Sequence, residues 1–373
     1  MLAPESPLPA TSGLRLRILH LARQLATSAE VELAVLGAVD AAPDEPFRLI
    51  GIPHTTTRGS ALLRGLRRPY MAAKLASPAM AAFASEARWD TVHAELPFLV
   101  PAALNACAPV VLGAQNVETE VVLSFVDIEP SALRRARWRW EARKTESFER
   151  AMTAAAAAVC TPSERDAAIF RSWGAKRVAI TPNGVDTDAV TFRDDRPGAG
   201  LLYVGHFGYR PNVAAANELI DEIFPLVRST VDGATVTLVG RDPPPALRAR
   251  AGGDVVVTGE VTEVLPYLHE ARALVVPLRT GGGTRLKVLE AMAAGLPVVS
   301  TSFGVSGLDV TPDRDFLHAE SAPALARQAI RVIQDEALET RVAENARRLV
   351  ERCYDWAAAA RSLVELHRDL AER

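Results

Sequence analysis

The chain has 373 residues, of which 49 % are hydrophobic and 23 % charged, and its formal net charge is −3. Its length exceeds one ordinary core and predicts two domains. The balanced charge does not favour nucleic acid as a partner. The cysteines (Cys107, Cys160, Cys353) and the seven histidines are scattered, so we expect neither a disulfide framework nor a metal site. With no signal peptide and no apolar run of about 20 residues, we expect a cytoplasmic protein.

The first half of the chain alternates strand and helix patterns. Its opening segment has barely two apolar residues before the first loop, so most of the strand that should feed this loop is missing. Either the chain is trimmed or its start has been assigned too late. The later elements are expected as strands at 31–37, 91–95 and 110–115, a helix at 131–152, and short β segments at 157–162 and 178–186. Such alternation predicts a parallel sheet with helices on both faces.

The alternation restarts after a stretch rich in Pro, Gly and Asp at residues 179–198. The expected strands of this second half are 200–207, 234–240, 254–261, 273–278 and 296–301, and the expected helices are 212–227, 264–271 and those after Ala322. We therefore predict an N-terminal α/β domain over residues 1–178 and a second over 179–355. A terminal helix follows over residues 356–373.

The run "GGGTRLKVLEAMAAGLPVVSTSFGVSG" begins with glycines that lead into a helix. Backbone N–H groups and the positive end of a helix dipole suit a phosphate. Arg285 and Lys287 stand in the first turn, which we expect to be exposed and where cations are unfavourable unless an anion binds there. Glu290 could accept hydrogen bonds from two ribose hydroxyls. These residues predict a nucleoside diphosphate ligand; the alternative is a plain turn with solvated cations, one of them paired with Glu290.

This succession resembles the donor-binding signature of retaining glycosyltransferases of GT-B architecture, in the "glycosyl transferases group 1" family. "PNGVD", "YVGHFGYRPN", "TLVGR" and "VTGEV" resemble the same family, and "QNVETE" and "TPSERD" do so more weakly. The resemblance covers nearly the whole chain. It implies two Rossmann-like domains facing a central cleft, the first for the acceptor and the second for the donor. It also implies that the terminal helix crosses back to the first domain, although its periodicity equally permits a helix that closes the second.

The resemblance assigns the donor site position by position. Glu290 would bind the ribose, and the loop around Gly283 would offer its amides to the donor. Glycines of both domains would let the backbone approach the diphosphate, and Arg241 would lie near the base. The donor-binding candidates are Gly13, Gly205, His206, Arg210, Asn212, Gly240, Arg241, Gly282, Gly283, Thr284, Arg285, Lys287 and Glu290.

Three positions depart from the family pattern. Gly282 stands where the family has its first glutamate, which touches the sugar. His206 and Asn212 stand where many members have an arginine and a lysine that hold the diphosphate. Because Arg285 and Lys287 belong to the loop and helix that face the diphosphate, we expect them to replace that pair.

The catalytic candidates are His93, Glu95 and Gln115 in the first domain. His93 and Glu95 follow a predicted strand, and Gln115 stands where members often have a histidine. Ligands of open α/β sheets bind at such strand ends, as could the neighbouring Asn116 and Glu118. We expect contact with the transferred sugar or the acceptor; a hydrogen-bonded loop histidine is the alternative for His93.

The function implied is transfer of a sugar from a nucleoside-diphosphate sugar to an acceptor hydroxyl with retention of configuration. We expect a UDP-sugar rather than a GDP-sugar, a saccharide, lipid-linked or small-molecule acceptor, and no metal or other cofactor. The departures at Gly282, His206, Asn212 and Gln115 leave a non-catalytic binding protein open as an alternative. A sugar-nucleotide 2-epimerase of the same architecture is the second alternative.

Two arginine-rich runs, residues 58–74 and 133–144, combine basic and apolar side chains. Helices of this composition can lie on an anionic membrane surface. They therefore predict peripheral contact with the inner face of the plasma membrane. Solvated helix faces are the alternative reading.

Overall fold

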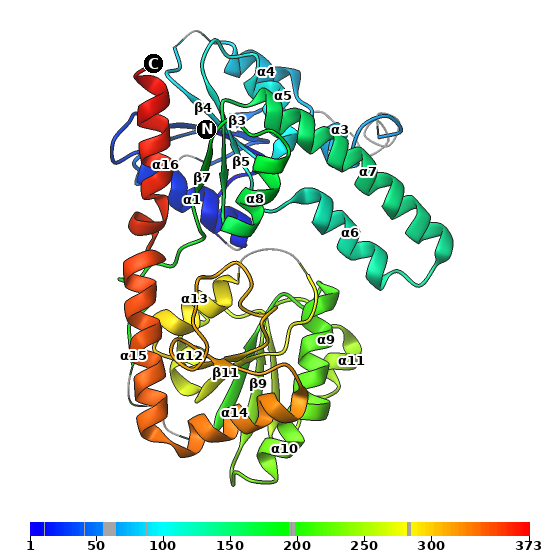
Figure 1. Cartoon of the computed structure of the whole chain (residues 1–373), viewed down its shortest axis with the longest axis vertical. Helices are drawn as coiled ribbons and strands as arrows, with labels where there is room; N and C mark the ends of the chain where they lie inside the picture. The colour runs from blue at the N-terminus through cyan, green and yellow to red at the C-terminus, as the bar shows by residue number, and fades with distance from the viewer. Residues whose placement is uncertain are drawn as a thin grey trace. The chain divides into compact units, whose positions relative to one another are not determined.

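The computed structural model describes residues 1–10, 12–40, 42–54, 65–86, 88–193, 195, 198–281 and 285–373. These residues form two compact units (Figure 1), each with its own buried core. Unit 1 contains Met1–Asn183 together with Ala359–Arg373, and unit 2 contains Gly184–Ala358. The chain therefore passes between the units twice, a few residues beyond the borders expected from the sequence. Gly282, Gly283 and Thr284 lie outside the described residues.

The described residues of unit 1 form a seven-stranded parallel sheet in the order β3-β2-β1-β4-β5-β6-β7. The strands are β1 (Leu2–Ala3), β2 (Glu32–Leu36), β3 (Arg48–Ile52), β4 (Val92–Glu95), β5 (Val110–Gly113), β6 (Ala158–Thr161) and β7 (Val178–Ile180). The short first strand is confirmed: Leu2 and Ala3 are both buried, and they pair with β2 on one side and β4 on the other. Two residues suffice to form this strand because both side chains are apolar and both lie between two neighbouring strands.

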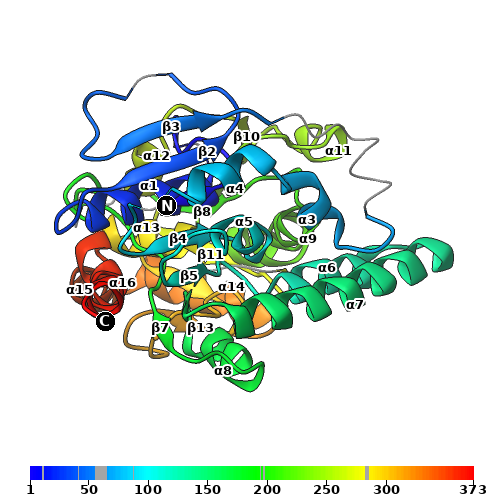
Figure 2. The same cartoon turned by 90° about the horizontal axis from the view of Figure 1, so that it is seen from above.

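Helices cover the sheet of unit 1 (Figure 2). They are α1 (Gly13–Leu25), α3 (Tyr70–Leu75), α4 (Pro78–Ala84), the short η1 (Pro97–Leu99), α5 (Val100–Ala103), α6 (Glu118–Ile128), α7 (Ala132–Ala155) and α8 (Glu164–Ser172). Serine caps begin several of them; Ser12, for example, accepts a hydrogen bond from the Arg15 amide at 3.3 Å. α6 and α7 form an antiparallel pair that projects from the unit (Figures 1 and 2).

The terminal helix α16 (Trp356–Ala371) completes unit 1 from Ala359 onward. Leu363 is fully buried there. Ser362 lies 3.2 Å from the Thr181 hydroxyl, and His367 lies 2.8 Å from the Thr91 hydroxyl. The side chain of Asp369 pairs with Arg177, the residue directly before β7. Because these partners come from far earlier in the chain, unit 1 is discontinuous in sequence.

The described residues of unit 2 form a six-stranded parallel sheet in the order β10-β9-β8-β11-β12-β13. The strands are β8 (Gly200–Val204), β9 (Thr235–Val239), β10 (Val255–Gly259), β11 (Ala273–Val276), β12 (Val298–Ser300) and β13 (Leu317–His318). The central strands are apolar throughout, as expected for a sheet covered on both faces. The parallel α/β architecture predicted from the alternation is thus confirmed in both units.

The helices of unit 2 flank this sheet on both faces (Figure 1). They are α9 (Arg210–Glu218), η2 (Leu219–Ile223), α10 (Phe224–Arg228), α11 (Pro245–Arg248), α12 (Leu265–Glu270), α13 (Leu286–Ala293), α14 (Ala322–Gln334) and α15 (Glu336–Cys353). The single helix expected at 212–227 contains the π-helical turn η2 just before Pro225. A π turn there accommodates the proline, which has no N–H and crowds the preceding turn. No helix of the described ranges is long and apolar enough to cross a membrane.

Candidate nucleotide-binding site

The donor-site candidates of unit 2 gather at one edge of its sheet. Since all its strands are parallel, the loops after β8, β9, β11 and β12 leave from the same edge. In open α/β sheets this carboxyl edge is where ligands bind. The sequence-predicted residues from Gly205 to Glu290 that the structure describes lie on these loops or on the helices that follow them.

Two of the predicted glycines bring neighbouring strand ends together. Gly240 follows β9 with a φ of +147°, a conformation that side-chain-bearing residues rarely adopt. A Cβ at Gly240 would overlap the carbonyl oxygen of Gly205 after β8. A Cβ at Gly205 would in turn lie 3.0 Å from the side chain of Asn212. These glycines therefore set the width of the edge at β8 and β9.

Lys287, on the first turn of α13, points its amine at residues of β8 and α9. Its Nζ lies 3.2 Å from the Tyr203 hydroxyl and 3.2 Å from Asn212 Oδ1. The amine also lies 4.3 Å from the centroid of the Tyr203 ring. The Tyr203 hydroxyl donates to Asn212 Oδ1 at 2.7 Å, so the three side chains form a closed cluster. Burial, reinforced by neighbouring Arg285, lowers the pKa of the Lys287 amine to about 7.

Arg285 stands at the N-cap position of α13. The exposed first turn expected from the sequence is wrong for this residue, which is only 8 % exposed. Its guanidinium lies 5.0 Å from the centroid of the Phe303 ring in the loop after β12. Burial lowers the pKa of Arg285. Arg285 and Lys287 stand at the positive end of one helix, and both are partly removed from water. This arrangement electrostatically favours a bound anion.

Glu290 lies one turn further along α13 and is half-buried. Burial raises the pKa of its carboxyl, and Lys287 partly counteracts that rise. In the described parts of the chain, no side-chain or backbone donor forms a hydrogen bond with this carboxylate. The alternative in which Glu290 pairs with a neighbouring cation is therefore not what the structure shows. This acceptor has no donor among the described residues and is therefore available to ligand hydroxyls.

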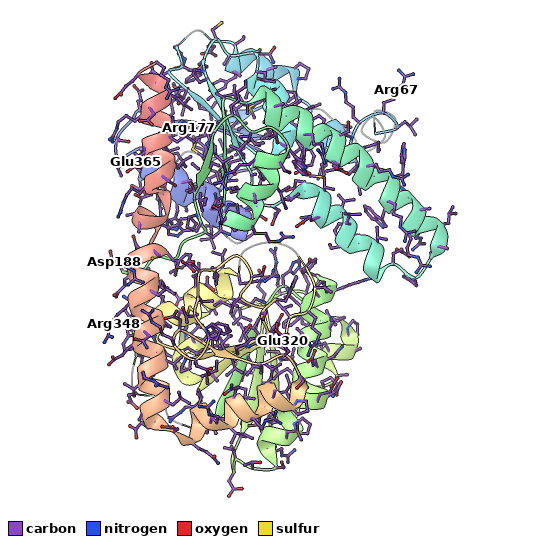
Figure 3. All side chains as sticks on the ribbon, viewed as in Figure 1. Arg67, Arg177, Asp188, Glu320, Arg348 and Glu365 are labelled. Atoms are coloured by element: carbon purple, nitrogen blue, oxygen red, sulfur yellow. The ribbon has the colours of Figure 1, made fainter. Side chains whose placement is uncertain are left out.

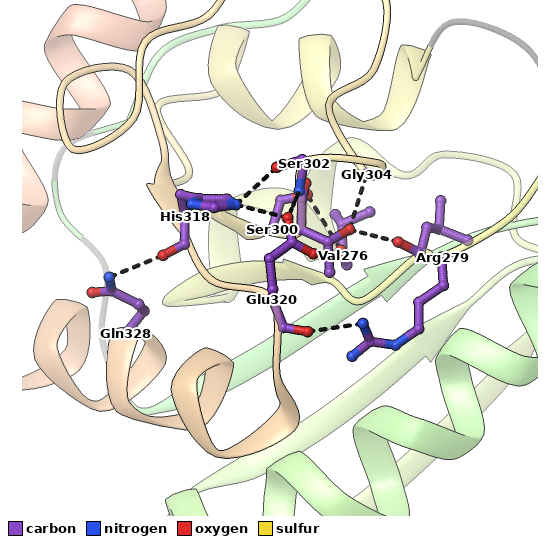
Figure 4. Close-up of polar contacts among 10 residues, drawn as sticks. Val276, Arg279, Ser300, Ser302, Gly304, His318, Glu320 and Gln328 are labelled. Atoms are coloured by element: carbon purple, nitrogen blue, oxygen red, sulfur yellow. Dashed lines mark hydrogen bonds and ion pairs between the residues drawn. The ribbon is translucent and has the colours of Figure 1, made fainter.

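The second glycine loop, after β12, is fixed by a polar network (Figure 4). Glu320 Oε1 accepts hydrogen bonds from the Ser302 amide and from His318 Nε2, both at 2.9 Å. Hydrogen bonds from the Ser302 side chain, then from His318 and the Ser302 backbone, lower the pKa of Glu320 to about 2. A Cβ at Gly304 would overlap the Ser300 hydroxyl. This loop carries Phe303, so the network also positions the ring beneath Arg285.

The remaining donor candidates are spread over both units. His206 is exposed and its Nε2 lies 2.9 Å from Asp242 Oδ2. Arg210 is exposed at the start of α9, and Arg241 is half-buried after β9. Gly13 is exposed at the start of α1, in unit 1. Of these, His206 and Arg241 lie on loops at the same sheet edge as Lys287.

The catalytic candidates of unit 1 are interior residues. His93 lies within β4 rather than after it, and both His93 and Glu95 are buried. His93 Nε2 lies 3.2 Å from Glu95 Oε1, and Gln115 donates to Glu95 Oε2 at 3.1 Å. On the other side, His93 Nδ1 lies 3.1 Å from His367 Nε2 of α16. The three candidates are brought together, in a hydrogen-bonded network that joins the sheet to the terminal helix.

Sequence reasoning missed Tyr203 and His367. Tyr203 contacts Lys287; it begins the motif "YVGHFGYRPN", but nothing in the motif marked its hydroxyl as a partner of α13. His367 completes the His93 network, and burial lowers its pKa well below the ordinary value. Glu118, at the start of α6, was noted as lying after a strand end but not selected. Burial and the nearby Glu149 raise its pKa to about 8.

Solved structures with the same architecture identify the fold. Sucrose-phosphate synthase from Thermosynechococcus elongatus superposes with a TM-score of 0.74 at 18 % identity, over 99 % of this chain and 98 % of that one. HepE of Anabaena, solved with UDP and glucose, gives 0.67 at 15 % identity over 99 % and 98 %. A glycosyltransferase from Rickettsia africae gives 0.68 at 13 % identity over 100 % and 98 %. The two parallel-sheet units are those of the GT-B glycosyltransferase fold.

Family models then identify the family. Residues 198–335 match the model described as "Glycosyl transferases group 1", and residues 11–189 match "Glycosyltransferase Family 4". The chain belongs to this glycosyltransferase family, as its motifs suggested. No match is found among curated proteins. The fold and family together make it a sugar transferase.

Proposed function

We propose that the protein transfers a sugar from a nucleoside-diphosphate sugar to an acceptor hydroxyl, with retention of configuration. The observation that carries the proposal is the start of α13, where Arg285 and Lys287 stand one turn before Glu290. Two cations, together with a carboxylate that has no donor among the described residues, match the two ends of a ribose diphosphate. A plain solvated turn would leave these side chains in water instead.

Lys287 supports the proposed replacement of the family's phosphate-binding lysine. Asn212 stands at that lysine's place in the chain, and the Lys287 amine lies 3.2 Å from its side chain. The amine thus reaches the same region from a different helix. With Arg285, it would neutralise the diphosphate as it departs, each charge-assisted hydrogen bond contributing about 1.5–3 kcal/mol.

The leaving diphosphate carries the chemistry in this proposal. Negative charge grows on its β-phosphate as the bond to the sugar breaks, so cations already in place stabilise the transition state more than the ground state. The acceptor hydroxyl attacks from the same face and gives its proton to the departing phosphate, which accounts for retention. No metal or further cofactor takes part. The donor we favour is a UDP-sugar, because the similar HepE was solved with UDP and glucose.

The roles proposed in unit 1 differ in kind. His93 and Glu95 are buried in a network with α16, so we assign them to positioning the carboxyl end of β4. Gln115 is half-buried at the end of β5 and anchored on Glu95. It is the candidate of the three with surface to offer to the sugar or acceptor.

Calorimetric titration tests the proposal. UDP should bind the parent protein. Glu290→Gln should weaken UDP binding by roughly 1–2 kcal/mol, because a charge-assisted acceptor becomes a neutral amide. For 2′,3′-dideoxy-UDP, which lacks the ribose hydroxyls, the same change should have little effect. The matched control Glu263→Gln alters an exposed acid of unit 2 and should change neither affinity.

Turnover is tested separately by product release from UDP-glucose, with and without saccharide acceptors. Analysis of the anomeric configuration of the product decides retention. If UDP, GDP, ADP and dTDP all fail to bind the parent, the nucleotide proposal is wrong. If Glu290→Gln lost equal affinity for UDP and for 2′,3′-dideoxy-UDP, Glu290 would have a structural role and would not bind the ribose.

A further inference from the structure

Helix α7 carries exposed arginines that the fold does not use. Arg134, Arg137, Arg139 and Arg143 are all exposed. Within the described residues, none of their side chains forms an ion pair or hydrogen bond with the protein. By contrast, Arg150 on the same helix pairs with Glu146 at 2.8 Å. Unpaired arginines on one helix create a local positive field although the chain has a net charge of −3.

Large apolar side chains accompany these arginines. Leu133 is 82 % exposed and Trp140 is 44 % exposed. They are seven residues apart, which is two helical turns, so they lie on the same face as Arg137 between them. The opposite face of α7 holds the buried residues Ala142, Thr145 and Glu149 and packs on the rest of unit 1. One face of α7 therefore packs in the core of unit 1, and the opposite face exposes apolar and basic side chains to solvent.

A second segment lies beside this face. Lys144 donates to the Arg68 carbonyl at 3.0 Å and also to the Gly65 carbonyl, while its amine lies 3.9 Å from the Trp140 ring centroid. This fixes Leu66, which is 63 % exposed, and the exposed Arg67 and Arg68 next to α7. Figure 3 shows Arg67 pointing away from the ribbon. Two segments far apart in sequence thus present the same combination of leucine and arginine.

We propose that this surface, called here the α7 surface (Arg67, Arg68, Leu133, Arg137, Trp140 and Arg143), docks unit 1 on a bilayer that contains anionic phospholipids. Arginine forms bidentate hydrogen bonds with phosphate, and tryptophan prefers the headgroup level. Exposed leucines can enter the acyl boundary, which neither a nucleic acid nor a soluble anion offers. The charge and the apolar side chains are then complementary to one partner.

Both contributions are needed for such docking. Arginines near an anionic leaflet attract it within about one Debye length, so the attraction falls as salt rises. Removing three of them should weaken binding by roughly a hundredfold. Leu133 and Trp140 add burial that salt does not screen. Hence the arginine and apolar variants should differ in their salt dependence.

The test is flotation of the full chain with vesicles of phosphatidylglycerol and phosphatidylcholine, compared with phosphatidylcholine alone. We expect binding to the anionic vesicles only. Arg67→Gln/Arg137→Gln/Arg143→Gln should abolish most of this binding, and Leu133→Ser/Trp140→Ser should weaken it at every salt concentration. The matched control Lys176→Gln/Arg361→Gln/Arg368→Gln removes three exposed cations elsewhere in unit 1 and should bind as the parent does. Circular dichroism checks that each variant is folded.

Three results would overturn the proposal: no binding of the parent to anionic vesicles, equal binding to neutral ones, or equal losses in the α7 and control triples. Tighter retention of an RNA heteropolymer, with vesicle binding unchanged by the apolar substitutions, would assign the surface to nucleic acid instead. Vesicle binding needs no nucleotide. Failure here therefore leaves the proposed sugar transfer untouched, and the reverse also holds.

Discussion

The charge of Lys287 should depend both on pH and on whether a nucleotide is bound. Burial lowers its pKa to about 7 from 10.5. Between those two values the unfolded chain binds a proton that the folded chain does not. The stability of the ligand-free protein should therefore rise with pH across this window and be lost progressively as pH falls toward 7. A diphosphate beside the amine would raise the pKa again.

Nucleotide binding should consequently take up protons. At pH 8 the ligand-free amine is mostly neutral, so UDP binding should draw roughly one proton from the buffer. Calorimetry in two buffers of different ionisation enthalpy measures this uptake directly. Lys287→Met should abolish it, whereas Lys176→Met, which alters an exposed lysine, should retain it. Binding without proton uptake in the parent would place the phosphates away from Lys287.

The residue scale also shows what spacing can and cannot predict. The order of parts was enough to select Arg285, Lys287 and Glu290, because all three lie within five residues of one another at the start of the helix that follows the glycine run. The contact between Arg285 and Phe303 could not be predicted, since the ring lies in a separate loop. Tyr203 was missed for the same reason: it lies 84 positions before Lys287. Partners across a parallel sheet have no fixed sequence offset.

At the scale of elements, the close approach of the loops after β8 and β9 depends on Gly240. Gly240→Ala should destabilise unit 2, because its Cβ would displace the Gly205 carbonyl and its φ of +147° would be strained. Gly233→Ala is the matched control, with a φ of +71° and no atom within 4 Å of its Cβ. It should cost about 1–2 kcal/mol from backbone strain alone.

Denaturant unfolding should therefore show Gly240→Ala to be less stable than Gly233→Ala by about 1–3 kcal/mol, the usual cost of overpacking. UDP affinity should fall in the first variant and not in the second. Equal stabilities would mean that the loop after β8 can move aside at little cost, and that the width of this edge is not set by the glycines.

Elements were predicted well where the hydrophobic pattern was long. The central strands of both sheets and the helix at 131–152 appear with borders shifted by a few residues. The opening strand was predictable as a short one, but its central position between β2 and β4 was not. Sheet order is decided by which strands pair, and pairing depends on crossover geometry rather than on the residues of one strand. Placing His93 after β4 rather than within it reflects the same weakness at strand ends.

On the scale of the whole molecule, two separate cores predict two unfolding transitions. Nucleotide at about a hundred times its Kd should stabilise only unit 2, by roughly 2.7 kcal/mol. Leu363→Ala on α16 should lower only the transition of unit 1, by about 2–5 kcal/mol, since Leu363 is fully buried there. Leu274→Ala on β11, equally buried, is the counterpart in unit 2. Differential scanning calorimetry measures the two transitions separately. A single peak that shifts in every variant would contradict independent unfolding of the two units.

The discontinuity of unit 1 has a consequence during synthesis of the chain. Gly184–Ala358 must be translated before α16 leaves the ribosome, which takes roughly 9–35 s at ordinary elongation rates. Through that interval Thr91 and His93 lack their contacts with His367 of α16. We expect nascent unit 1 to be a chaperone client until α16 arrives, while unit 2, being continuous, can fold at once. Ribosome-bound chains ending before and after α16 should differ sharply in the protease resistance of unit 1.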